Sequence, residues 1–141
     1  MNEKQIEEIA TGLHSGAIRL LRMLREEDKA SGISGPRLSA LSVLVFGGST
    51  SLAGLAAAEQ VKPPTMSRIV EGLVQAGLAT REPDPANRRM VRIQATAEGV
   101  RLLNAGRQRR VRALTRRLED LADSEQRALA RAAELLERLT R

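Results

Sequence analysis

The sequence predicts a mainly helical α+β fold, with four helices, a two-stranded hairpin and two further helices in that order. Over most of the 141 residues, apolar side chains recur every three or four positions, as in helices that bury one face. Residues 89–95 alternate between apolar and polar side chains, which is typical of a half-exposed strand. Turn-forming residues at 83–87 separate this segment from a shorter strand candidate at 78–82. The two strands are therefore expected to form a hairpin.

The first predicted helix covers residues 6–29, and a break rich in glycine and serine follows at 31–36. Ser34 is expected to cap a second helix, with a proline in its first turn. This helix runs to Phe46 and ends at a pair of glycines. The apolar positions of the first helix are Ile6, Ile9, Leu13, Ala17, Leu20, Leu21 and Leu24.

Two short helices precede the hairpin. Ser51 is expected to cap the first of them, which ends near Glu59 and consists mostly of small residues. The second begins at Pro63, since proline is tolerated in a first helical turn, and Gly77 is expected to stop it. Its predicted buried stripe comprises Met66, Ile69, Val70, Leu73 and Val74.

Two helices joined by a tight link and followed by a hairpin form a winged helix-turn-helix. A helix fits the major groove of B-DNA, and the first turns of the second helix meet the base edges. Thr65, Ser67 and Arg68 are predicted to point outward there, and Lys62 in front of the helix suits a phosphate. The alternative for Lys62 and Arg68 is that both are only solvated.

The hairpin carries four arginines, which repel one another unless a polyanion is nearby. Arg81 lies on the first strand, Arg88 and Arg89 lie near the tip, and Arg92 lies on the second strand. We expect the first three to contact DNA and Asp84 to orient a tip arginine by ion pairing. The alternative is a solvated, charged hairpin.

Charge is concentrated in the same part of the chain. The formal net charge is +6, and residues 62–117 hold 13 basic and 4 acidic side chains. Such a localised positive field suits a polyanionic partner, because phosphate binding releases counterions. A run of arginines further along is expected to be a solvated helix face. It comprises Arg107, Arg109, Arg110, Arg112, Arg116 and Arg117.

Other classes of protein are disfavoured. The chain has no cysteine and one histidine, His14, so disulfides, thiol chemistry and the usual zinc ligand sets are not expected. No nucleophile–base pair or glycine-rich phosphate loop is present, so we expect neither an enzyme nor a cofactor. No apolar run reaches the roughly 18 residues of a membrane span. The polar first residues argue against a secretory signal, and a cytoplasmic protein is expected.

A series of motifs within residues 50–99 resembles the core of the multiple antibiotic resistance regulator (MarR) family. In order they are Leu55-Ala56, Ser67-Arg68, the Leu-x-x-x-Gly-Leu run at 73–78, Arg81, the wing-tip group Asp84, Asn87, Arg88 and Arg89, and Ala95-Thr96-Ala97-Glu98-Gly99. Two positions depart from the family pattern. Asn87 replaces an aspartate, so a hydrogen bond is expected there in place of an ion pair. Ala86 stands where some members carry another arginine.

The resemblance implies a homodimer that binds a palindromic operator as a repressor. Residues 1–33 and 100–141 would form the helical dimerisation region, and 34–99 the DNA-binding region. It also implies a small aromatic or phenolic effector held between the two regions. Three alternatives stay open: terminal helices that form an intramolecular bundle, an architectural or nucleoid protein that coats DNA without sequence preference, and an adaptor that has lost DNA binding.

Overall fold

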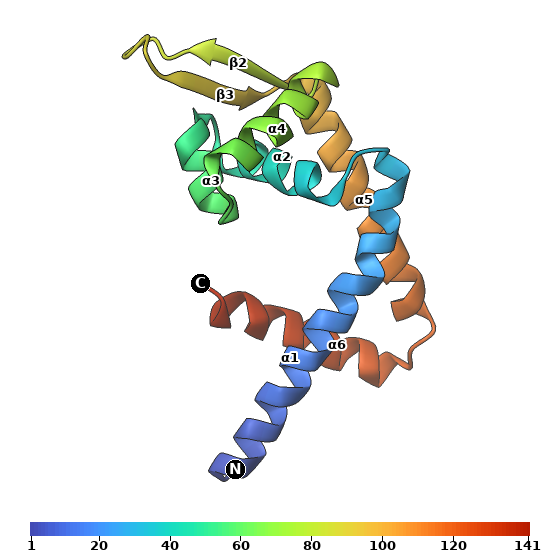
Figure 1. The fold of residues 1–141 in the computed structure, drawn as a ribbon. Coiled ribbons are helices and arrows are strands. Elements are labelled where there is room, and N and C mark those ends of the chain that lie inside the picture. The colour runs from blue at the N-terminus through green and yellow to red at the C-terminus, as the bar shows by residue number, and fades with distance from the viewer.

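The structure is a computed structural model that describes all 141 residues. It contains six α-helices, one 3-10 helix (η1) and three strands (Figure 1). In chain order these are α1 Glu3–Arg25, η1 Glu26–Ser31, α2 Gly35–Gly47, β1 Thr50–Ser51, α3 Leu52–Glu59, α4 Pro63–Gln75, β2 Ala79–Pro83, β3 Val91–Ala95, α5 Ala97–Glu119 and α6 Asp123–Leu139.

The predicted fold class and order of helices and hairpin strands are confirmed, with two additions. The first helix ends at Arg25 and tightens into η1, whereas the periodicity had extended it to residue 29. Strand β1 is only two residues long and pairs antiparallel with β3, which gives the sheet order β1-β3-β2. A two-residue strand shows no alternation, so the sequence pattern could not reveal it.

Side-chain caps explain where two of the helices begin. The Ser51 hydroxyl accepts a hydrogen bond from the Gly54 N–H at 3.0 Å, which starts α3. The Thr96 hydroxyl likewise accepts from the Gly99 N–H at 3.1 Å, which starts α5. Ser34 precedes α2 but makes no such bond. Gly77, with a φ of +73°, has the left-handed backbone that follows a helix end.

The hydrophobic core lies entirely within the winged lobe, residues 34–99. Its buried members are Ala40, Leu41, Leu44, Leu55, Ala56, Met66, Val70, Leu73, Leu78, Ala79 and Ile93. The terminal helices α1 and α6 contain no buried residue. The lobe therefore has a core of its own, whereas the apolar faces of the terminal helices remain open.

Figure 1 shows how these parts are arranged. Helix α5 leaves the lobe and runs alongside the end of α1, and α6 follows it at the end of the molecule away from the hairpin. The hairpin of β2 and β3 projects from the opposite end of the molecule. None of the helices is both long enough and apolar enough to cross a membrane.

Candidate nucleic-acid interface

Helix α4 is anchored by one face and exposes the other. Met66, Val70 and Leu73 are fully buried in the core, so the side of the helix opposite them faces outward. Arg68 is exposed on that side and makes no ion pair within the chain. The outward side of α4 is therefore polar, and an α-helix fits the major groove of B-DNA.

The structure places the predicted residues at the start of α4 as follows. Lys62 is exposed and precedes the first helical residue. Thr65 is exposed in the first turn, and Ser67 is half-buried in the second. Thr65 is three residues before Arg68, so the two side chains lie on the same side of α4.

The tip of the hairpin is held by two side chains that bond to the main chain. The Asp84 carboxylate accepts a hydrogen bond from the Ala86 N–H at 2.8 Å. The Asn87 side-chain oxygen accepts one from the Arg89 N–H at 3.2 Å. The Asp84 N–H also donates to the Met90 carbonyl at 2.8 Å, which closes the turn. Aspartate and asparagine commonly stabilise turns in this way.

The predicted ion pair between Asp84 and a tip arginine is wrong for this structure. No ion pair involves Asp84, because its carboxylate turns back onto the backbone two residues further along. Arg88 and Arg89 are both exposed and have no acidic partner in the chain. Asp84 and Asn87 shape the loop that carries these two guanidinium groups, and they leave the groups free to bind an anion.

Arg81 differs from the tip arginines because it is tied to α4. Its Nη2 lies 3.2 Å from a carboxylate oxygen of Glu71, and its side chain is only 35% exposed. The other Glu71 oxygen accepts a hydrogen bond from Gln75 at 3.2 Å. This chain of contacts fastens the base of the wing to the outer side of α4. It also neutralises the one acidic residue on α4.

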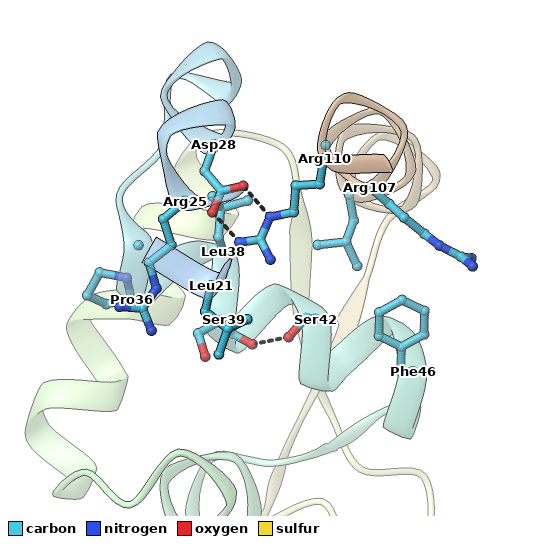
Figure 2. Close-up of a pocket in the computed structure, with 13 residues that line it drawn as sticks. Leu21, Arg25, Asp28, Pro36, Leu38, Ser39, Ser42, Phe46, Arg107 and Arg110 are labelled. Carbon is cyan, nitrogen blue, oxygen red and sulfur yellow. Dashed lines mark hydrogen bonds and ion pairs between the residues drawn. The ribbon is translucent and has the colours of Figure 1, made fainter. Parts of the chain in front are cut away.

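A cavity of about 770 Å³ lies where α1, η1, α2 and α5 meet (Figure 2). Its lining contains three arginines and one acidic residue, Asp28, and the chain's only aromatic side chain, Phe46. Arg25 comes from α1, whereas Arg107 and Arg110 come from α5. Sequence reasoning missed this cavity, because its walls come from segments more than 80 residues apart.

Arg110 corrects the prediction that the arginines of α5 are all solvated. Its guanidinium forms a two-point ion pair with Asp28, with 2.7 Å between Nε and Oδ1 (Figure 2). These hydrogen bonds raise the pKa of Arg110 above its ordinary value, although burial opposes the rise. An arginine side chain is charged at every pH near neutrality, and the ion pair holds this one in the cavity wall. The cavity therefore keeps a positive group in its wall.

Comparisons with known proteins agree with this architecture. The profile of the MarR family matches residues 33–91. An uncharacterized HTH-type transcriptional regulator from Mycobacterium leprae is 34% identical over 128 residues, which cover 91% of this chain and 90% of the relative. An HTH-type transcriptional regulator from Mycobacterium tuberculosis is 35% identical with the same coverage.

Solved structures show the same fold across the full length. A MarR family protein from Bacillus stearothermophilus has a TM-score of 0.78 at 26% identity, covering 100% of this chain and 99% of that one. A Staphylococcus aureus MepR variant bound to an oligodeoxyribonucleotide has a TM-score of 0.73 at 18% identity. It covers 93% of this chain and 97% of its own. At that identity the likeness concerns the fold alone.

A winged helix with an exposed polar recognition helix and a basic wing defines a DNA-binding transcription regulator. The chain belongs to the MarR family. The resemblance seen in the sequence motifs is therefore confirmed. The matched relatives are regulators and not enzymes, in agreement with the sequence prediction.

Proposed function

We propose that this protein is a homodimeric repressor that binds a palindromic operator through α4 and the wing. The observation that carries the proposal is that Arg68 on α4 and Arg88 and Arg89 at the wing tip are exposed and form no ion pair within the chain. Unpaired guanidinium groups that are close together, such as those of the adjacent Arg88 and Arg89, repel one another, and the phosphates of DNA relieve that repulsion. Repression is the simplest mode, because a dimer seated across a promoter blocks it without further contacts.

Within this proposal the residues have different roles. Thr65, Ser67 and Arg68 read base edges from the first turns of α4, where helix-turn-helix proteins make such contacts. Lys62, which precedes α4, binds a phosphate of the DNA backbone. The wing arginines contact the DNA backbone or the neighbouring minor groove. Glu71 positions Arg81, and the loop shaped by Asp84 and Asn87 carries Arg88 and Arg89.

A non-specific architectural protein is the second candidate, and a footprint of the purified protein on genomic DNA separates the two. The proposal expects discrete protected sites with two half-sites about one helical turn, or roughly 34–36 Å, apart. Uniform coating of the DNA would favour the architectural alternative. Charge alone suffices for coating, whereas the polar side chains at positions 65 and 67 suit base recognition.

Replacing Arg89 by alanine tests the wing. We expect roughly tenfold weaker operator binding at about 0.1 M salt, because one phosphate contact contributes a slope of about −0.9 to the dependence of log K on log salt. Fluorescence anisotropy at several salt concentrations measures both quantities. Arg127→Ala removes the same charge as a control, on the side of α6 opposite to Leu136 and its apolar stripe. Unchanged affinity in Arg89→Ala would remove the wing from the interface.

The cavity supports a further part of the proposal, a small anionic effector. Three arginines and one aspartate line the cavity, so the lining has an excess of positive charge. Phe46 is 70% exposed at the cavity wall and offers a ring face for stacking. An aromatic or phenolic carboxylate satisfies both features. Its binding between the terminal helices and α2 would shift the lobe relative to the dimer region and release DNA.

Two substitutions in the Asp28–Arg110 pair should move effector affinity in opposite directions. Asp28→Asn frees the guanidinium and should strengthen binding of an anion, whereas Arg110→Gln should weaken it roughly 10- to 100-fold, since charge-assisted hydrogen bonds contribute about 1.5–3 kcal/mol. Calorimetric titration with 4-hydroxybenzoate measures this, and phenol is the neutral control. Equal weakening by both variants would show that the ion pair only supports the cavity wall.

A further inference from the structure

One position on the outer flank of α4 is covered by a residue from another helix. Gly72 is buried, although it lies one helical turn beyond the exposed Arg68 on the same side of α4. The cover is the side chain of Arg37 from the first turn of α2. A methyl group at position 72 would overlap the Nε and Cζ of Arg37 and lie 2.5 Å from its Nη2. The guanidinium therefore occupies the space that a side chain at position 72 would fill.

The charge of Arg37 has no partner within the chain. Arg37 is exposed, and it forms no ion pair or side-chain hydrogen bond with another residue. Its neighbours Pro36 and Leu38 line the cavity, but Arg37 does not. The first turn of α2 thus directs this one cation toward α4. Packing against a glycine brings the guanidinium close to α4 without neutralising it.

We propose that Arg37 is an additional DNA-backbone-binding residue, seated on Gly72 beside the recognition helix. The 13 residues of α4 span about 20 Å, whereas the major groove is about 12 Å wide. A helix that reads bases with its first turns therefore leaves the groove in its second half, where the phosphate ridge passes. Gly72 lies in that half, about 6 Å along the axis from Arg68.

The chemistry of the group fits this role. A guanidinium presents parallel N–H donors that match two oxygens of one phosphate. The contact with Gly72 places the guanidinium beside α4, where it is available to a phosphate that passes the helix. The assignment rests on the proposed docking of α4 in the groove. It extends the interface to a helix whose other side lines the cavity.

Arg37→Ala should reduce operator affinity roughly tenfold at about 0.1 M salt and lower the salt slope by about one. The loss should be equal on operator and scrambled DNA, because a phosphate contact carries no sequence information. Arg37→Lys should retain most of the slope. Fluorescence anisotropy over a salt series measures these values, with Arg127→Ala as the charge control.

Gly72→Ala tests the seat separately, because the methyl group displaces only the end of a flexible side chain. It should weaken binding when Arg37 is present and have no further effect in the Arg37→Ala background. An unchanged salt slope in Arg37→Ala, while Arg68→Ala still weakens binding, would overturn the role of Arg37 alone. If neither variant changes binding, the proposed docking of α4 fails as well. Thermal unfolding confirms that each variant is folded.

Discussion

Arg68→Ala is expected to weaken operator binding by about 1–3 kcal/mol, roughly 5- to 150-fold, because a two-point contact between arginine and a base contributes that much discrimination. Arg68 is exposed in the second turn of α4, where base contacts are made. No acidic side chain in the protein holds its guanidinium. It is therefore available to bind guanine, for which arginine is the usual partner.

The measurement compares affinities for the footprinted operator and for a scrambled duplex at one salt concentration. Base reading by Arg68 should reduce the first affinity far more than the second, so the specificity ratio falls. Arg68→Lys keeps the charge but loses the two-point geometry. Its specificity ratio should therefore lie between those of the wild-type protein and the alanine variant. An equal loss on both duplexes would make Arg68 a phosphate contact.

The fold was predictable because most of its determinants are local. Helical periodicity placed α4, and single side chains such as Ser51 and Thr96 marked helix starts that the hydrogen bonds confirm. Thr65 and Arg68 lie on the same side of α4 for the same reason, since they are three residues apart on a single helix. Strand β1 was missed because two residues are too short to show a pattern.

Contacts between distant segments explain what the sequence pattern could not show. The Asp28–Arg110 pair joins residues that are 82 positions apart in the sequence. Within its own helix, each of them is one charged residue among several. Glu71 on α4 forms an ion pair with Arg81 on β2, so an arginine predicted to contact DNA is positioned by α4. Arg37 was overlooked because its significance depends on the missing side chain at Gly72. Each of these depends on packing between elements, which periodicity does not specify.

The second large effect is expected from the terminal helices, because they hold apolar surface without a partner. Leu13 on α1 is 44% exposed and Leu136 on α6 is 41% exposed, and neither helix contributes to the core of the lobe. Such stripes need a partner surface, and a stable interface buries roughly 1,200–2,000 Å² in total. We propose that a second copy of the chain supplies it, with α1 and α6 at the interface.

Leu13→Asp combined with Leu136→Asp should convert a dimer into a folded monomer. A monomer engages one half-site at a time, so operator affinity should fall by roughly 10²- to 10⁴-fold, the gain that linkage of two modules usually provides. Sedimentation equilibrium reports the mass, circular dichroism the folding and anisotropy the DNA affinity. Thr11→Asp places the same charge on the polar side of α1 and should leave all three unchanged.

The result is informative because the lobe does not depend on these positions. All core residues lie between Ala40 and Ile93, so a charge at either leucine should leave the recognition helix and wing intact. A double variant that remains dimeric would place the interface elsewhere on the chain. A monomeric variant that binds the operator as tightly as the wild-type protein would show that one lobe suffices. The palindromic operator would then have no counterpart in the symmetry of the protein.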